Sequence, residues 1–423
     1  MLRIHRFFLK TILLVLFLGA GIVALAQEYD LLIRHAHMID PKNEIDQPMD
    51  VAVAGGKIAK VAEQIPEGSA KTTVDASGMY IVPGLIDIHA HLFWGTEPDS
   101  YISNSHASLP PDGFTLRSGV TTVVDAGSSG WRNFKTFKEQ TIDYSTSRVF
   151  AFLNIVGCGM KGGAIEQNLG DMDPKLTAIV ARQYADYIVG IKLAHYSGPE
   201  WDPLLRTVEA GTQADIPVMI DFGGNRPPLS LERLFLEELR PGDIFTHCFA
   251  HVRGRTAIVD ETGKVRPYVW EAQKKGIIFD VGHGGGSFVF DQAMPALDQG
   301  FRPNSISTDL HTGSMNAGMK DMLNIMSKLM NMGMTLNEVI TTSTWNPAKY
   351  IKHEELGHLS EGAVADIAVL SMREGDFGFE DVRGMKIKGT RKLECELTVL
   401  DGKVVYDLNG ISMPEWHAGA ENE

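Results

Sequence analysis

The feature that most constrains the fold is the segment 83–91, Pro-Gly-Leu-Ile-Asp-Ile-His-Ala-His, in which an apolar run ends in two histidines. The Pro-Gly pair interrupts the chain before the run, and the run has the length and composition of a buried β-strand. Alternate side chains of a strand lie on one face, so His89 and His91 can point into one pocket and bind one metal ion. The alternative is a pair of ordinary core or surface histidines, which does not explain why these features occur together.

Apolar runs alternate with helical stretches after this segment, and this pattern predicts parallel strands joined by helices. Eight runs qualify as strands, which is enough to close a barrel. They are 85–89, 121–125, 149–155, 188–193, 217–221, 243–247, 276–281 and 305–309. The predicted helices include 173–186, 229–239, 267–275 and 319–332. In such barrels the functional side chains lie at the carboxyl ends of the strands.

Residues that can bind a metal occur at the ends of several of these strands. The polar side chains at these ends are His89, His91, Lys192, Asp221, His247 and Asp309. The structural alternatives are a core histidine at His247, a paired ammonium at Lys192 and a helix N-cap at Asp309. Imidazole nitrogens and carboxylate oxygens are ordinary zinc ligands, so the set predicts a divalent-metal centre.

In combination these motifs resemble the ligand set of the amidohydrolase superfamily, metal-dependent hydrolases built on an α/β fold, the (β/α)8 TIM-like barrel. The resemblance implies one or two divalent ions, Zn2+ above others, with Lys192 carboxylated and bridging the two. This is chemically reasonable, because two neighbouring cations need an anionic bridge and an ammonium would repel both. The resemblance also implies that Asp309 binds the first ion and carries a proton from the attacking water to the leaving group.

The fifth strand departs from the family pattern. Residues 215–223 read Asp-Ile-Pro-Val-Met-Ile-Asp-Phe-Gly, and Asp221 stands where deacetylase-like members usually have a metal-binding histidine. Asp221 can ligate the second ion through oxygen, or it can leave that ion weakly held. The sequence therefore leaves open whether the centre holds one ion or two.

The loop after the seventh strand supplies candidates for substrate binding. Residues 282–288 read Gly-His-Gly-Gly-Gly-Ser-Phe, an arrangement that resembles the amidohydrolase/deacetylase branch. Glycines let backbone N–H groups approach a ligand, so His283, Gly285, Gly286 and Ser287 are the expected contacts. The alternative is a loop that is simply mobile.

Further candidates follow the predicted strands. We expect substrate contacts from His195, Tyr196, Arg226, His251 and His311, and Arg253 and Arg255 lie after the sixth strand. An arginine can pair with a substrate carboxylate through two hydrogen bonds. Each of these residues, taken alone, is also compatible with a solvated surface position.

Both ends of the chain are rich in short strands. Strands are predicted at 29–33, 50–54, 57–62 and 73–75, and again at 365–371, 397–400 and 403–406. Amidohydrolases commonly carry a β-sandwich assembled from both termini. The resemblance therefore implies a β-sandwich domain of 27–82 and 358–410 beside a barrel of 83–357, with a tail over 411–423.

The first 26 residues read as an export signal. Arg3, Arg6 and Lys10 precede an apolar run over 11–24, and the Ala-Leu-Ala at 24–26 matches a cleavage site. The run is short for a bilayer span, which disfavours an uncleaved anchor. We therefore expect a mature chain that begins at Gln27, acts in the periplasm or outside the cell, and has no stable membrane insertion.

Composition excludes several other classes of protein. With 423 residues, 44% of them hydrophobic and 22% charged, the chain can bury a large core. A formal net charge of -14 gives no basis for nucleic-acid binding. Cys158, Cys248 and Cys395 are odd in number and far apart, so buried thiols are expected rather than disulfides.

The combined prediction is an exported metal-dependent hydrolase that cleaves an amide, or an ester, in a small substrate without an organic cofactor. A metal-bound hydroxide would attack the carbonyl carbon, and Asp309 would carry the proton. The alternatives are dihydroorotase-like opening of a cyclic amide or imide, cleavage of a dipeptide, and a non-catalytic metal- or ligand-binding barrel. The substrate, the native metal and any homo-oligomeric state stay open.

Overall fold

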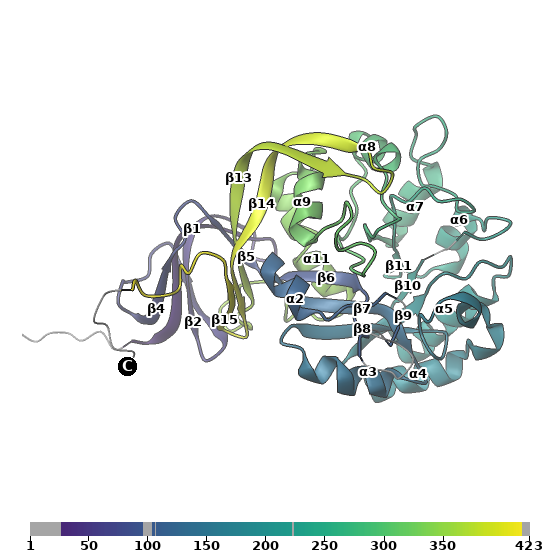
Figure 1. Ribbon diagram of the computed structural model, residues 1–423, viewed down its shortest axis with the longest axis horizontal. Helices are drawn as coiled ribbons and strands as arrows, with labels where there is room; N and C mark the ends of the chain where they lie inside the picture. The colour runs from purple at the N-terminus through teal and green to yellow at the C-terminus, as the bar shows by residue number, and fades with distance from the viewer. Residues whose placement is uncertain (1–26, 96–103, 106, 222–223, 417–423) are drawn as a thin grey trace, which may run out of the picture.

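The computed structural model describes residues 27–95, 104–105, 107–221 and 224–416. Two β-sheets define the architecture: a mixed sheet of eight strands at one end and a curled parallel sheet of seven strands at the other (Figure 1). The predicted export signal lies outside the described residues, as does 417–423 in the predicted tail. Within the described ranges, none of the helices combines the length and the apolar character that a membrane span requires.

The parallel sheet is formed by the predicted barrel strands in sequence order. They are β6 (Leu85–Ala90), β7 (Val120–Gly130), β8 (Arg148–Asn154), β9 (Ile188–Leu193), β10 (Val218–Ile220), β11 (Ile244–Phe245) and β12 (Ile278–Phe279). These strands are almost wholly buried, as continuous apolar runs require. The first seven predicted strands are confirmed, and the last three of them are shorter than expected.

The predicted eighth strand is not a regular strand. Instead, its ends bridge the two edges of the parallel sheet: Ser305 pairs with Asp280 beside β12, and Leu310 pairs with Ala90 of β6. Between these bridges Asp309 has a φ of 50°, a left-handed conformation that regular strands do not contain. The segment therefore joins both sheet edges and directs the Asp309 side chain away from the usual strand alternation.

Helices cover the outer side of the parallel sheet, with α3, α4 and α5 along β7, β8 and β9 (Figure 1). The longer ones are α3 (Phe134–Gln140), α4 (Pro174–Gln183), α5 (Asp202–Ala214), α7 (Pro267–Lys275), α8 (Phe290–Asp298), α9 (Met322–Met330), α10 (Leu336–Thr341) and α11 (Trp345–Tyr350). Short turns are α2 (Asp112–Thr115), η1 (Leu116–Ser118), η2 (Ile142–Tyr144), η3 (Gly163–Gln167), η4 (Leu169–Asp171), α6 (Leu231–Arg233) and the π-helical η5 (Leu234–Glu238). The predicted helix at 229–239 is thus split between α6 and η5, whereas the other three predicted helices are confirmed.

Local capping residues explain where several helices begin. The Asp173 side chain accepts a hydrogen bond from the backbone of Leu176 at the start of α4, and Pro174 occupies the first helical position. Thr335 and Glu338 form a reciprocal capping box at the start of α10. These capping residues determine where α4 and α10 begin.

The mixed sheet combines strands from both ends of the chain. Its path runs β15 (Lys403–Asp407), β14 (Lys386–Leu400), β13 (Ile367–Glu380), β5 (Tyr80–Pro83), β1 (Tyr29–Asp40), β2 (Ile45–Ala54) and β3 (Lys57–Ala62), and β4 (Ala70–Asp75) pairs with β1. The antiparallel pairing of β13 with β5 brings strands from the two chain ends into one sheet. The eight strands share one hydrogen-bonded sheet, so the implied β-sandwich and its boundaries stay predictions.

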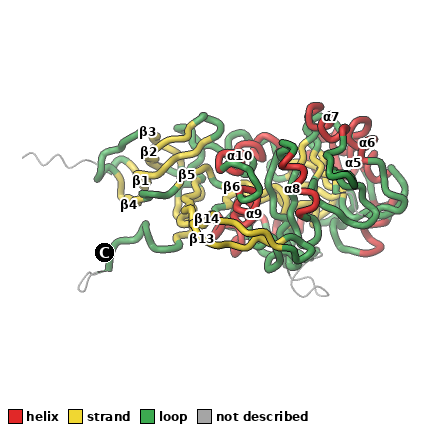
Figure 2. The backbone as a smooth tube through the Cα atoms, turned by 90° about the horizontal axis from the view of Figure 1, so that it is seen from above, coloured by secondary structure: helices red, strands yellow, loops and turns green. Residues whose placement is uncertain are grey.

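Strands β13 and β14 form a hairpin arm that extends from the mixed sheet across the parallel-sheet part (Figures 1 and 2). Both strands are far longer than the predicted runs. At the tip, the Val382 N–H donates to the carbonyl of Phe288 at 3.1 Å, and Arg383 pairs with Asp291 at 2.8 Å. The arm therefore contacts the loop that follows β12.

The cysteines form no disulfide within the described residues. Cys248 and Cys395 are buried, as predicted, but Cys158 is only partly buried. Cys158 lies in the turn after β8, where the chain leaves the core, and this explains its partial exposure.

Candidate active site

The predicted metal ligands converge on one cavity at the carboxyl ends of the parallel strands. The cavity has a volume of about 360 Å3. Its wall contains all six candidates: His89, His91, Lys192, Asp221, His247 and Asp309. The structure thus brings together side chains that are widely spaced in the sequence, as the strand-end argument requires.

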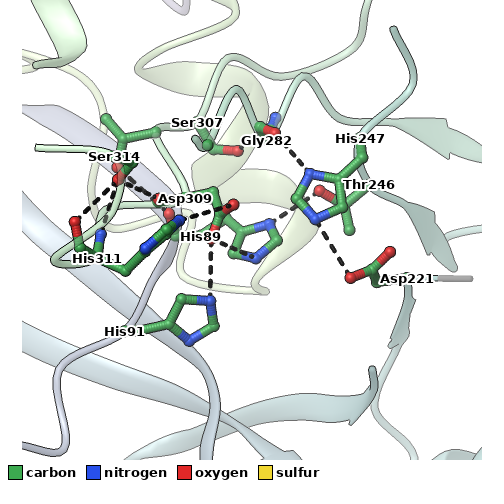
Figure 3. Close-up of polar contacts among 12 residues, drawn as sticks. His89, His91, Asp221, Thr246, His247, Gly282, Ser307, Asp309, His311 and Ser314 are labelled. Atoms are coloured by element: carbon green, nitrogen blue, oxygen red, sulfur yellow. Dashed lines mark hydrogen bonds and ion pairs between the residues drawn. The ribbon is translucent and has the colours of Figure 1, made fainter. Parts of the chain in front are cut away.

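His89, His91 and Asp309 form a compact group of metal-binding atoms (Figure 3). One ring nitrogen of each histidine and one carboxylate oxygen lie within 4.8 Å of one another, and all three residues are buried. Oδ1 of Asp309 is 3.0 Å from Nε2 of His91 and 3.6 Å from Nε2 of His89. Two imidazoles and one carboxylate at this spacing suit a divalent ion such as zinc.

A buried hydrogen-bond chain fixes the ring of His89. The Thr246 hydroxyl donates to Asp280 at 2.7 Å, so it must accept from Nδ1 of His89, which lies 2.9 Å away. Ser305 and Ser307 also donate to Asp280, each at 2.7 Å. The ring of His89 is therefore protonated on Nδ1, and the lone pair on Nε2 faces the cavity.

His247 is oriented in the same way. Its Nδ1 donates to the carbonyl of Gly282 at 2.5 Å, which leaves Nε2 facing the Asp221 carboxylate at 3.3 Å (Figure 3).

The ring of His89 is neutral at physiological pH. Burial, with Lys192 nearby, holds the pKa of His89 well below its usual value. A neutral ring is the form of histidine that binds a metal.

Asp221 is the centre of a second polar group. Its Oδ2 lies 3.3 Å from Nε2 of His247 and 3.7 Å from Nε2 of His195. Its Oδ1 lies 3.2 Å from the buried guanidinium of Arg255. Burial raises the pKa of Asp221, but His247, Lys192 and His195 outweigh burial and hold it well below the usual range. Asp221 is therefore ionised, with Oδ2 directed toward the two imidazoles and Oδ1 toward Arg255.

Lys192 lies on the same cavity and is 1% exposed. Its Nζ is 3.3 Å from Nε2 of His89 and 3.5 Å from the sulfur of Met219. Burial lowers the pKa of the Lys192 amine, although Asp221 and Asp309 act in the opposite direction. The buried amine thus lies among the candidate ligands, and its environment disfavours the charged form.

Some of the predicted substrate contacts reach the cavity. Those that line it are His195, Gly286, Ser287 and His311. The remaining described wall is mostly apolar and includes Ala107, Met160, Ala194 and Val252, and the buried Arg255 completes it. Gly285 lies in the same loop as Gly286 but is not part of the described wall. Roles in substrate binding stay predictions for all of these residues.

His283 does not line the described cavity, and a substrate contact at this residue stays a prediction. The ring is fully buried, and it stacks on Phe288 with ring centroids 4.5 Å apart. Its Nε2 accepts a hydrogen bond from Lys328 at 2.5 Å. The ring of Phe288 and the amine of Lys328 on α9 hold the His283 side chain away from the cavity.

Four further predicted contacts lie outside the described cavity wall. The Tyr196 hydroxyl donates to Glu200, and Tyr196 lines a separate small pocket. Arg226, His251 and Arg253 are exposed on loops that extend beyond the strand ends. Substrate contacts at Tyr196, Arg226 and His251 therefore stay predictions that this cavity wall does not support.

The sequence interpretation missed several buried acids beside the site. Asp280 orients His89 through Thr246, and Asp125 accepts backbone hydrogen bonds from Leu92 and Ser128, each at 2.7 Å. Asp87 accepts from Thr308, and burial raises its pKa to about 7. Each acid interrupts an otherwise apolar strand, and this pattern is the signal that could have identified them.

Comparison with known proteins identifies relatives over most of the chain. Residues 290–405 match the family model described as "Amidohydrolase family". A deacetylase from Agrobacterium fabrum is 32% identical over 84% of this chain and 86% of its own length. A deacetylase from Brucella anthropi is 33% identical over 85% of this chain and 88% of its own length.

Solved structures agree with these sequence relatives. A crystal structure titled as an adenine deaminase has a TM-score of 0.80 and 28% identity, and it covers 90% of this chain and 100% of its own. A crystal structure titled as a dihydroorotase has a TM-score of 0.78 and 29% identity, with coverage of 89% and 99%. The chain therefore belongs to the amidohydrolase family and is a hydrolase that acts on carbon–nitrogen bonds other than peptide bonds.

Proposed function

We propose that this hydrolase is a deacetylase-like, metal-dependent enzyme that cleaves an amide, or an ester, bond of a small substrate. The similarity to proteins named deacetylase supports this choice, and it extends to one from Enterococcus faecalis that is 30% identical over 90% of this chain. The observation that carries the proposal is the convergence of His89, His91 and Asp309 with Lys192 on one buried cavity.

The donor groups of the cavity suit a divalent metal centre. His89, His91 and Asp309 would hold one ion, and Asp221 and His247 offer ligands for a second. Zinc accepts this mixture of nitrogen and oxygen ligands. When bound, such ions lower the pKa of water and polarise a substrate carbonyl.

Lys192 is proposed to be carboxylated. An unprotonated amine can add to carbon dioxide, forming a nitrogen–carbon bond and releasing one proton, which leaves a carbamate. The reaction needs the nitrogen lone pair, and burial favours the unprotonated form by lowering the pKa of Lys192. The product would place an anion where cations are to be bound.

Asp309 is proposed to move the proton. Burial raises the pKa of its carboxyl group, but contacts with His91 and His247 outweigh burial, so the pKa is lowered overall. Asp309 is therefore ionised at neutral pH and can accept a proton from the attacking water. Transfer of that proton to the leaving nitrogen or oxygen completes the cleavage.

The cavity suits a small molecule. A volume of about 360 Å3 lies at the lower end of ordinary ligand sites. Ala107, Ala194 and Val252 offer an apolar surface to an acyl group, whereas Ser287 and His311 can hydrogen-bond to a polar group. These contacts favour a compact substrate with one short acyl group.

Ring opening of a cyclic amide or imide is the second candidate. The similarity to the dihydroorotase structure favours it, since that likeness covers nearly the whole of both chains. Both reactions require the same attack on a carbonyl carbon, and they differ in whether the two products separate.

Several features of the fold extend the proposal. We propose that 305–310 serves as the eighth strand of a barrel over 83–357, since it bridges both edges of the parallel sheet. The two chain ends, 27–82 and 358–410, would form the accessory domain, with 411–423 as a tail.

The proposal includes export of the enzyme. The signal-like pattern of 1–26 supports export to the periplasm or the medium.

The test uses the purified chain after loading with zinc or manganese. N-acetyl amino acids, acetylated hydroxy acids and cyclic imides are incubated with it, and free acetate and ring-opened product are measured separately. Metal-dependent release of acetate would support the proposal, and ring opening without a second product would favour the second candidate. Inactivity on both panels by a metal-loaded chain would refute both and favour a non-catalytic barrel.

A further inference from the structure

We propose that Lys328 and His283 are positioning residues for the glycine loop, defined as 284–287, and that through this loop they set how tightly the substrate is bound. The inference rests on the proposed function, because Gly286 and Ser287 are the predicted substrate contacts of this loop that line the cavity. It gives His283 a different role from the direct contact that the sequence suggests.

The glycine loop has few side chains with which to anchor itself. Residues 284–286 are three consecutive glycines, which have no side chains to pack. A Cβ atom at Gly286 would have no atom within 4 Å, so the chain at this point borders open space. The position of the loop therefore depends on what holds its two ends.

The residues at the two ends of the loop contact each other. His283 precedes the loop and Phe288 follows it, and both side chains are fully buried. Their rings are stacked, with centroids 4.5 Å apart and an angle of 9° between the planes. The carbonyl of Phe288 also accepts from the Val382 N–H of the hairpin arm at 3.1 Å. The stack thus closes the base of the loop.

Lys328 of α9 contacts both rings of this stack. Its Nζ lies 2.5 Å from Nε2 of His283 and 5.1 Å from the centroid of the Phe288 ring. It also donates to the carbonyls of Gly318 and Glu380, so its printed partners are a ring nitrogen and two carbonyls rather than a carboxylate. Burying an amine in this way is costly, and a methionine would fill similar space without that cost. Stability alone therefore does not explain the lysine.

The hydrogen bonds of the His283 ring fix the peptide group of Gly284. Nδ1 lies 3.0 Å from the carbonyl oxygen of Gly284, which can only accept, so Nδ1 donates. Burial and the Lys328 amine keep the pKa of His283 well below its usual value, so the ring is neutral and has one N–H. Nε2 must then accept from Lys328. This contact selects the tautomer that binds the Gly284 carbonyl.

The bond from His283 to Gly284 lies where the chain enters the turn at 284–286. The N–H groups of His283 and Gly284 donate to the carbonyls of Ser307 and Thr308, at 3.2 and 2.9 Å. A Cβ atom at Gly284 would lie 2.2 Å from Oδ2 of Asp309, so the backbone is also close to that carboxylate. The His283 ring therefore holds the first peptide group of the loop, and a shift of this group would move the cavity wall that follows.

The test is a double-mutant cycle in the full, metal-loaded chain. Lys328→Met, His283→Leu and the double variant are assayed with the amide, ester or cyclic imide that wild type cleaves fastest. We expect KM to rise on the order of 10-fold in Lys328→Met, the effect of one weakened hydrogen bond to the substrate. The value of kcat should change much less, because the candidate metal ligands are kept. The double variant should have the KM of His283→Leu, because Lys328 acts through His283.

His283→Asn tests the bond to Gly284 without changing Lys328. The amide nitrogen of asparagine can occupy the place of Nδ1 and donate to the Gly284 carbonyl, whereas leucine has no donor. Both variants lose the stacked ring and the contact with the amine. The KM of His283→Asn should therefore lie closer to wild type than that of His283→Leu, and equal values would overturn the role of this bond.

Lys275→Met is the matched control for Lys328→Met. The amine of Lys275 in α7 donates to the carbonyls of Phe235, Leu236 and Leu239, at 3.2, 2.9 and 2.9 Å. The same substitution thus removes a similar set of hydrogen bonds, and none of these residues is in the described cavity wall. Lys275→Met should lower Tm and leave KM unchanged.

Hydrogen exchange reports on the loop without turnover. Peptides that cover 282–290 should exchange faster in Lys328→Met than in wild type, and at the wild-type rate in Lys275→Met. An unchanged KM in Lys328→Met would overturn the inference, as would an equal rise in Lys275→Met or additive effects in the double variant. A metal-loaded wild type that cleaves nothing would overturn the proposed function, and the exchange rates would still decide whether Lys328 positions the loop.

Discussion

Nζ of Lys328 lies 2.5 Å from Nε2 of His283, and neither side chain is exposed to solvent. Burial lowers the pKa of Lys328 to about 7, and burial together with this amine holds the pKa of His283 well below its usual value. The amine also donates to the carbonyls of Gly318 and Glu380. Lys328 therefore connects α9, the hairpin arm and the loop after β12.

The free energy of unfolding should rise with pH because the amine of Lys328 is buried. The amine has a pKa of about 7 in the folded chain and 10.5 as its ordinary value, so the unfolded chain binds more protons between these limits. The free energy of unfolding then increases with pH in this window, and below pH 7 the full cost of burying the charge remains. Relative to Lys328→Met, wild type should gain at most roughly 1.4 kcal/mol per pH unit. Denaturant titrations at several pH values would measure this, and parallel curves for the two proteins would contradict it.

Lys192→Ala should lose metal, because the proposed anionic bridge is removed from a buried site. Metal analysis after desalting should show the loss, and a short carboxylic acid added to the variant should restore part of the activity by occupying the same space. Lys175→Ala, at an exposed position of α4, is the control and should change neither quantity. Full metal content in Lys192→Ala would be incompatible with the bridge.

Asp309→Asn should lower kcat, because the amide is nearly the same size as the carboxylate but cannot accept the proton. A loss on the order of 10²–10⁴-fold is typical for removal of a general base. Steady-state kinetics with metal measured in the same sample separates lost chemistry from lost metal. Unchanged turnover by the metal-loaded variant would show that another group moves the proton.

Gly284→Ala should impair catalysis by displacing Asp309. A Cβ at Gly284 would lie 2.2 Å from Oδ2 of Asp309, and the residue has a φ of 56°. Gly300→Ala is the matched control: it also has a positive φ, of 88°, but no atom lies within 4 Å of its Cβ position. Both variants should lose stability on the order of 1 kcal/mol from the backbone, but a large fall in kcat is expected only for Gly284→Ala. Equal kcat in the two variants would rule out the displacement.

The convergence of the candidate ligands could be predicted from strand periodicity and from the position of these residues at the carboxyl ends of parallel strands, whereas their roles were implied by the family resemblance. The His89–His91 pair needs only a period of two, and Lys192, His247 and Asp309 each follow a recognisable apolar run. The irregular path near Asp309 could not be predicted, because its left-handed φ is imposed by contacts with both sheet edges.

Tertiary contacts also explain the other differences between the predictions and the structure. His283 is buried because Lys328 and Phe288 pack against it. Lys328 is distant in the sequence, and no sequence pattern predicts the contact with Phe288. The hairpin arm escaped prediction because charged residues and glycines dominate its outer part, and its strands are stabilised by pairing and by contacts with α9. The roles of Asp280 and Thr246 become visible only once β11 and β12 lie side by side.

The hairpin arm also links the mixed sheet to the cavity. Glu380 and Val382 of the arm bind Lys328 and the carbonyl of Phe288, in the loop that also carries Gly286 and Ser287. Gly286 and Ser287 line the cavity, whereas the described wall contains no residue of β13 or β14. A substitution that loosens the arm should therefore disturb the cavity wall from a distance, without removing any group that touches a bound molecule.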